Sequence, residues 1–142
     1  MRRAFRAVRQ QRSFRIEAIV VLPDHLHTVW TLPEGDNDYP GRWRAIKSRF
    51  TRAVKDRGVS LDPNAKGEYG LWRRRHWEHT IRNDEDLQRH VDYIHFNAVK
   101  HGLVRCVSDL PHSSFHYHLR RGRVSRDWAG TQFDVDSDGY GE

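Results

Sequence analysis

Alternating apolar and polar positions predict a β-hairpin in the first quarter of the chain. The run Arg15–Leu22 is rich in β-branched residues, the turn residues Pro23-Asp24 follow, and a second run covers His25–Leu32. Side chains two residues apart on a strand point to the same face, so His25 and His27 project together, about 6.6 Å apart along the strand. We expect this face to point outward, where two imidazoles on a rigid strand can reach one metal ion.

Apolar residues at three- and four-residue spacing predict a basic helix from Arg42 to Arg57. Its apolar side chains are expected to face a core, and its basic side chains to point outward. The outward set is Arg42, Arg49, Arg52 and Lys55. A charged helix face is more often simply solvated, so this pattern alone does not establish binding.

A second helix is predicted between Asn83 or Asp84, either of which can act as its N-cap, and Gly102, which suits a C-terminal stop. Its apolar stripe is Leu87, Val91, Ile94 and Ala98. Tyr93 and Asn97 lie one turn apart on a neighbouring face. A phenol and an amide carbonyl therefore point in the same direction.

The order of elements predicts an α+β fold with an antiparallel sheet. The predicted elements, in chain order, are a short N-terminal helix, the hairpin, the basic helix, a possible strand near Trp77–Arg82, the tyrosine helix and a short segment near Leu119. The chain has 142 residues, enough for one domain but not for two. We expect that domain over residues 1–128 and a polar, acidic, disordered tail over residues 129–142.

Charge indicates a polyanionic partner. The first 126 residues contain all 25 Lys and Arg but only 14 of the 19 acidic residues. Such an excess favours nucleic acid, and aromatic residues interleaved with the basic run near Trp72 suit single strands. The DNA-contacting candidates are Arg42, Arg49, Arg52, Lys55, Arg73, Arg74, Arg75 and Lys100. No apolar run is long enough for a membrane span and no signal peptide is evident, so we expect a cytoplasmic, nucleoid-associated protein with no membrane partner.

The remaining histidines leave a second metal site open. The pair His76 and His79 has a spacing that could hold zinc. The same holds for the cluster His112, His116 and His118. With Cys106 as the only cysteine, neither a thiolate zinc site nor a disulfide within one chain is possible. We expect these histidines, with His95 and His101, near DNA phosphates or at the surface instead.

Four segments together resemble one known family. They are Val21–Trp30 with its His-Leu-His triplet, Trp43–Phe50, Trp72–Arg82 and Tyr93–Leu103. In this order they resemble the REP-associated tyrosine transposases, which are single-tyrosine members of the HUH endonuclease superfamily. The resemblance runs from about Phe14 to about Trp128.

The resemblance implies an enzyme of DNA transposition or recombination that depends on Mg²⁺ or Mn²⁺. Such an enzyme nicks and rejoins single-stranded DNA through a 5′-phosphotyrosine intermediate. By position, Tyr93 matches the nucleophile, His25 and His27 match the metal-binding triplet, and Asn97 matches a third metal ligand. The implied substrate is hairpin DNA of repetitive extragenic palindromes, and the implied fold is a ferredoxin-like antiparallel sheet with helices on one face.

Two positions depart from the family pattern. The first β-strand of the family is missing here, for which a mis-called start, a degraded gene copy and a partner chain that completes the sheet are competing explanations. The last of these makes a homodimer possible. Ala98 stands where the family commonly has proline, which could let the helix run further and shift Asn97.

Two other functions stay open on the sequence. A non-catalytic module that binds DNA hairpins would keep the basic surface without the chemistry. A metal-dependent nuclease that uses water would cleave DNA without Tyr93.

Overall fold

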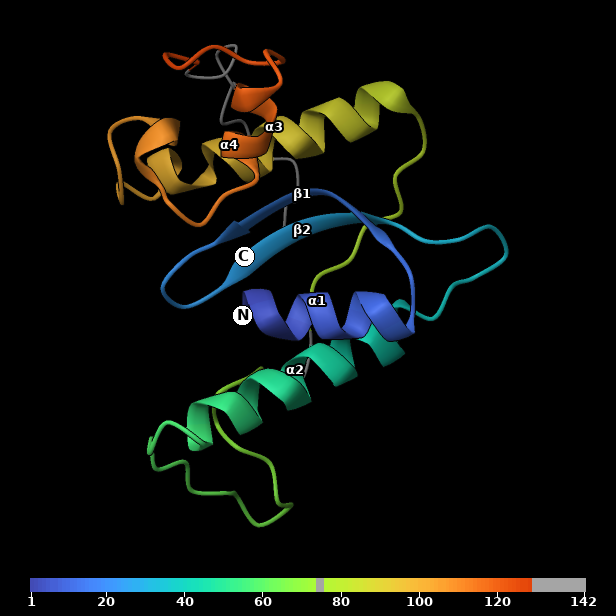
Figure 1. Ribbon diagram of the computed structural model, residues 1–142, viewed down its shortest axis with the longest axis vertical. Helices are drawn as coiled ribbons and strands as arrows, with labels where there is room; N and C mark the ends of the chain where they lie inside the picture. The colour runs from blue at the N-terminus through green and yellow to red at the C-terminus, as the bar shows by residue number, and fades with distance from the viewer. Residues whose placement is uncertain (74–75, 129–142) are drawn as a thin grey trace. The chain divides into compact units, whose positions relative to one another are not determined.

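The computed structural model describes residues 1–73 and 76–128. The predicted contacts of Arg74 and Arg75 and the predicted tail 129–142 lie outside these residues. The elements in chain order are α1 (Arg2–Gln11), β1 (Arg15–Val21), β2 (Leu26–Thr31), α2 (Tyr39–Lys55), α3 (Asp84–Lys100), a 3-10 turn (Val107–Asp109) and α4 (Phe115–Arg120) (Figure 1). The α+β prediction is confirmed. Among the described residues, no helix is both long enough and apolar enough to cross a membrane.

The chain divides into two compact units, and the single domain expected over residues 1–128 stays a prediction. One unit combines Met1–Phe14 with Leu32–Glu78, and the other combines Arg15–Thr31 with the chain from His79 onward. The first unit therefore contains α1 and α2, and the second contains the sheet, α3 and α4.

In the second unit, β1 and β2 form the predicted antiparallel hairpin. Leu22 N donates to the His25 carbonyl (2.9 Å) across the turn, and Val20 stands opposite His27. The other edge of β1 is also paired, because Val21 N donates to the His112 carbonyl (2.9 Å). Ser114 N donates to the carbonyl of Ile19, two residues earlier in β1 (2.8 Å).

The limits of α3 follow from its end residues, as predicted. The Asn83 side chain accepts from Asp86 N, and the first turn is acidic, which suits the positive end of the helix dipole. At the other end Gly102 adopts φ 67°, a conformation that glycine reaches without strain. Leu103 N and Gly102 N donate back into the last turn at 2.9 Å each, so the helix stops at Lys100 although Ala98 could have extended it.

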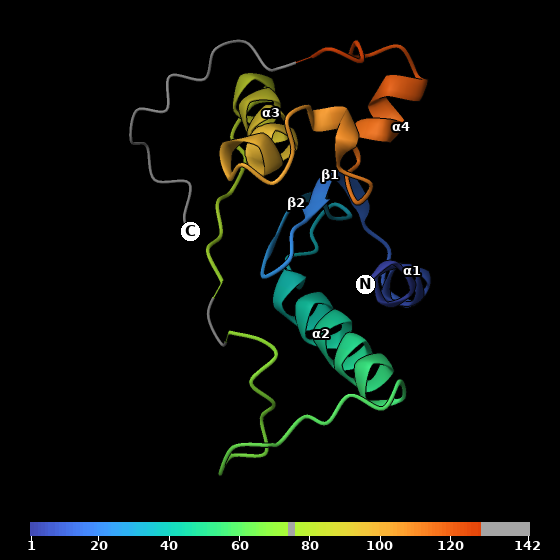
Figure 2. The same cartoon turned by 90° about the vertical axis from the view of Figure 1, so that its left-hand side faces the viewer.

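The α3 helix covers one face of the sheet (Figure 2). The core between them is formed by Ala18, Val20, Leu22, Ile94 and Ala98, each less than a tenth exposed. Opposite residues of an antiparallel pair share a face, and His27 stands opposite Val20. The prediction that the histidine face points outward is therefore wrong: this face meets α3.

In the first unit, α1 and α2 lie side by side (Figure 1). Phe5 of α1 meets Trp43 of α2 edge to face with ring centroids 6.0 Å apart. Ala4, Val8 and Ile46 are buried with Phe5. Residues from both helices thus provide the apolar core of this unit.

Two further predictions differ from the structure. No strand forms over residues 77–82, because this segment is exposed and Arg82 N donates to the Asp86 carboxylate (3.0 Å) instead of to a strand. The described residues form a two-stranded sheet, so the finer ferredoxin-like arrangement stays a prediction.

Candidate active site

The hairpin turn sets the orientation of His25. Its Nδ1 lies 2.7 Å from Asp24 Oδ1, and this hydrogen bond is the main reason that the pKa of Asp24 is lowered. An ionised carboxylate only accepts hydrogen bonds, so Nδ1 carries the proton and the lone pair of the ring is on Nε2. A carboxylate that fixes the tautomer in this way is the usual companion of a metal-binding histidine.

Four aromatic side chains from the hairpin and α3 come together. The rings of His25 and His27 meet edge to face with centroids 5.1 Å apart. His27 meets Tyr93 in the same manner at 5.7 Å, and His25 meets His101 at 5.3 Å. The structure therefore brings the histidine pair and the predicted nucleophile into one cluster.

Asn97 lies one helical turn beyond Tyr93 and is completely buried. Among the described residues, neither its Oδ1 nor its Nδ2 has a hydrogen-bond partner. Burying an amide without hydrogen-bond partners costs about 1–3 kcal/mol of stability. Native proteins rarely contain a buried amide whose hydrogen bonds are unmade. This unsatisfied oxygen is therefore available to a ligand on the face of α3 that carries Tyr93.

Lys100, predicted as a DNA contact, lies beside Tyr93. Its Nζ is 3.4 Å from the Tyr93 hydroxyl and 5.2 Å from the centre of the ring. An ammonium in this position favours negative charge on the phenol oxygen and can also hold a phosphate next to it.

These residues fit a divalent metal. The cluster offers two imidazoles, one of them already oriented by a carboxylate, and the unsatisfied amide oxygen of Asn97. Imidazole with neutral oxygen suits Mg²⁺ less well than Mn²⁺, because nitrogen ligands favour the transition metal.

The basic residues predicted to contact DNA have different surroundings. Arg52 and Arg73 are exposed. Lys55 donates to the Tyr69 hydroxyl (2.8 Å), and Arg52, Lys55 and Tyr69 line an open pocket. Arg49 donates to Gln11 Oε1 (2.8 Å). These residues leave a basic surface on α2 and the loop that follows it.

The prediction that Arg42 points outward is wrong. Arg42 is 2% exposed, and Nη2 donates to Asp36 Oδ2 at 2.6 Å and to the Ser13 carbonyl at 2.9 Å. The Arg42 guanidinium lowers the pKa of Asp36 to about 2. This arginine holds the start of α2 and does not face solvent.

Some residues of the cluster were missed or misplaced by sequence reasoning. Asp24 was read only as a turn residue, although an acid directly before the histidine pair was an available signal. His101 is exposed, which agrees with one of the two expectations for it, but its contact with His25 was not foreseen. His95 is buried, contrary to expectation, and burial lowers its pKa to about 4.

Comparisons with known proteins show the family to which the chain belongs. No protein-family model matches the chain. A REP-associated tyrosine transposase of Escherichia coli K12 is 48% identical over 134 residues, which are 94% of this chain and 74% of the relative. A putative REP-associated tyrosine transposase of Haemophilus influenzae is 41% identical over 131 residues, 91% of this chain and 74% of that protein. The chain belongs to the REP-associated tyrosine transposases.

A solved structure supports the same assignment for the fold. It is a REP-associated tyrosine transposase bound to a REP hairpin, with 47% identity and a TM-score of 0.79, and the match covers 95% of this chain and 74% of that one. In the present chain, the ring of Tyr93 meets that of His27.

Proposed function

We propose that this chain is a metal-dependent single-stranded DNA transesterase that acts on hairpin DNA through a 5′-phosphotyrosine. The observation that carries the proposal is the contact of Tyr93 with the histidine pair, 5.7 Å from the ring of His27. The unsatisfied amide of Asn97 one turn further on supports a metal at the same place. The relative solved with a REP hairpin supports hairpin DNA as the substrate.

His25, His27 and Asn97 would hold Mg²⁺ or Mn²⁺. When bound, this ion would polarise the scissile phosphate. The Asp24 carboxylate keeps the lone pair of His25 on Nε2, and so prepares the ligand before DNA arrives.

Tyr93 would attack the phosphorus, and the bond between phosphorus and the 3′ oxygen would break. The phenol loses a proton and the departing 3′ oxygen gains one, so no net proton is consumed. One phosphodiester is exchanged for another, and the reverse attack by a 3′ hydroxyl rejoins the strand. Lys100, 3.4 Å from the Tyr93 hydroxyl, would hold the phosphate and stabilise charge on the phenol oxygen.

The basic residues Arg49, Arg52, Lys55 and Arg73 would contact the DNA backbone. Such contacts position the strand without selecting its sequence, and their contribution falls as salt is raised.

The direct test uses one hairpin oligonucleotide labelled at either end, incubated with the purified chain and Mn²⁺ and separated on a denaturing gel. A 5′-phosphotyrosine predicts that the 3′ label moves with the protein, while the 5′ label leaves on a free fragment. Tyr93→Phe should abolish both products, because it removes the attacking oxygen and little else.

Tyr117→Phe is the matched control, since Tyr117 is exposed and outside the cluster. Cleavage that persists in Tyr93→Phe without a covalent band would indicate a nuclease that uses water. Hairpin binding without any cleavage, and unaffected by His25→Ala or a chelator, would favour a non-catalytic binding module.

A further inference from the structure

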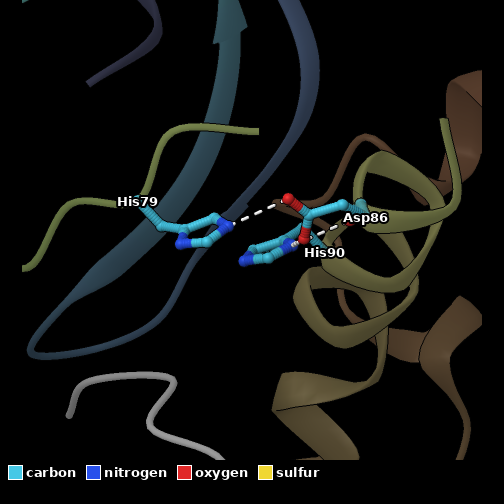
Figure 3. Close-up of side chains that lie close together, drawn as sticks. All are labelled: His79, Asp86 and His90. Atoms are coloured by element: carbon cyan, nitrogen blue, oxygen red, sulfur yellow. Dashed lines mark hydrogen bonds and ion pairs between the residues drawn. The ribbon is translucent and has the colours of Figure 1, made fainter. Parts of the chain in front are cut away.

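A second group of potential metal ligands lies at the beginning of α3 (Figure 3). His79, Asp86 and His90 each offer one ligand atom, and these atoms all lie within 4.8 Å of one another. The sequence had suggested His79 as a zinc ligand together with His76. The structure groups it with Asp86 and His90 instead.

Asp86 is the centre of this group. Its Oδ2 lies 3.0 Å from His79 Nε2, and its Oδ1 lies 3.1 Å from His90 Nδ1. Asp86 and His90 are 7% and 6% exposed. Both oxygens of the Asp86 carboxylate therefore face imidazole nitrogens.

We propose that His79, Asp86 and His90 form a zinc site. Two imidazoles and one carboxylate are a ligand set that zinc uses in proteins, with water in the remaining position. Mg²⁺ and Ca²⁺ prefer oxygen ligands, so this set selects a transition metal against them.

The distances are close to those that the ion requires. Bonds of about 2.0–2.1 Å at tetrahedral angles hold neighbouring ligand atoms about 3.3 Å apart. The 3.0 Å distance from His79 Nε2 to Asp86 Oδ2 already lies near this value. His90 Nδ1 donates to the Asp86 carbonyl (2.8 Å), which leaves Nε2 as the ligand atom of that ring. The widest separation within the group is at most 4.8 Å, so closure moves one ligand by about 1.5 Å.

His79 is the member that would move. The rings of His79 and His90 are stacked, with centroids 4.7 Å apart and planes 10° apart, whereas a metal ion lies in the plane of each ring that binds it. The His90 ring is fixed from the helix, since its Nδ1 lies 2.8 Å from the Asp86 carbonyl. The His79 side chain is 29% exposed and precedes α3, so it can rotate out of the stack toward the ion, and solvent can supply the water ligand.

The proposed zinc site is separate from the site of Tyr93. The nearest proposed ligands of the two sites on α3 are His90 and Asn97, which are seven residues apart, or about 10 Å along the helix axis, although Tyr93 itself follows His90 by only three residues. Paired metal ions that share a reacting phosphate lie only about 3.5–4 Å apart. Zinc at this position therefore has a structural role: it fastens the segment around His79 to the start of α3.

The test measures metal content, so it does not depend on DNA cleavage. In a His25→Ala/His27→Ala background, which removes the proposed catalytic metal site, the protein is stripped with chelator, equilibrated with Zn²⁺ and dialysed. Atomic spectrometry should find about one zinc per chain, and zinc should raise Tm. Adding His79→Gln should reduce the zinc to less than about a fifth of an equivalent and remove the rise in Tm.

His79→Gln is the main variant because its exposed side chain can be replaced without opening the core. Asp86→Asn keeps the shape of the carboxylate but not its charge, and should also lose zinc. His112→Gln removes an exposed histidine elsewhere, and this variant should retain zinc. The proposal is overturned if the background protein retains no zinc, or if zinc content is the same in His79→Gln and His112→Gln; the three residues would then be only a hydrogen-bonded cap of α3.

Discussion

The start of α2 and the middle of α3 each bury one polar side chain, and the two have opposite surroundings. Arg42 is 2% exposed and donates to the Asp36 carboxylate and to the carbonyls of Ser13 and Asp38. Asn97 is 0% exposed, and neither of its amide atoms has a hydrogen-bond partner in the part of the chain that the structure describes. A buried polar group with partners stabilises the fold, whereas one without partners costs free energy and calls for a ligand. The contrast separates a structural arginine from a candidate metal-binding asparagine, although sequence alone had assigned both to function.

The sharpest test of this contrast is Asn97→Leu. Leucine has the same branching and the same number of heavy atoms, so it fits the site while removing the unsatisfied amide. We expect the free energy of unfolding to rise by about 1–2 kcal/mol, and formation of the covalent DNA adduct to fall at least about a hundredfold. Urea unfolding and the denaturing gel measure the two effects.

If Asn97→Leu lowered stability and left adduct formation intact, the amide would have a structural role. Asn37→Leu, at an exposed loop position, is the control for the substitution itself.

Arg42→Met tests the opposite case. It keeps the apolar stem and removes the bonds to Asp36, Ser13 and Asp38, so we expect a loss of about 2–3 kcal/mol in the free energy of unfolding. Below its lowered Tm, the variant should still form the adduct. Arg44→Met, at an exposed position of the same helix, should change stability little. An Arg42→Met protein that is fully stable but no longer binds hairpin DNA would restore Arg42 to the DNA contacts.

The surroundings of His95 lie between those of Arg42 and Asn97. Its side chain is buried and has a hydrogen-bond partner, Ser114 Oγ, at 2.9 Å. Burial, and then the charge of His118, lower its pKa from 6.5 to about 4. Between these values the unfolded chain binds more protons than the folded one, so stability is complete above about pH 6.5 and falls as pH decreases toward 4.

We expect this histidine to account for a loss of about 2 kcal/mol between pH 7 and 4.5. Urea unfolding measures the free energy of unfolding across this range. This free energy should depend less steeply on pH in His95→Leu than in the parent protein. Equal slopes in the two proteins would contradict the assignment.

Asp24→Asn should have the smallest effect. The amide oxygen can still accept from His25 Nδ1, but the negative charge that orients and polarises the ring is lost. We expect about a tenfold increase in the Mn²⁺ concentration that gives half-maximal adduct formation. Asp109→Asn, an exposed acid outside the cluster, should have no effect on the Mn²⁺ requirement.

Local sequence patterns predicted most elements of the fold. The hairpin follows from two-residue alternation, and the limits of α3 follow from Asn83 and Gly102 as end residues. These signals lie within a few residues of the structure that they specify. The pairing of Tyr93 with the histidines was implied by the family resemblance instead.

Features that depend on distant partners were not predictable in this way. A strand forms only where another backbone pairs with it, and residues 77–82 do not form a strand in the described structure. Likewise, the burial of Arg42 depends on Ser13, which lies 29 residues away. The face of the hairpin that meets α3 could not be known before α3 was placed.

The pairing of β1 with residues near the end of the described chain has a consequence for synthesis on the ribosome. Ser114 binds Ile19 across 95 residues, and α3 begins more than 50 residues after β2 ends. At a translation rate of about 5–20 residues per second, the hairpin waits roughly 3–10 s before α3 can cover it. During that interval the histidine face and one edge of β1 are uncovered, and contacts of such long range also slow folding. A nascent chain therefore completes its candidate active site last, after almost all of its basic surface has already been made.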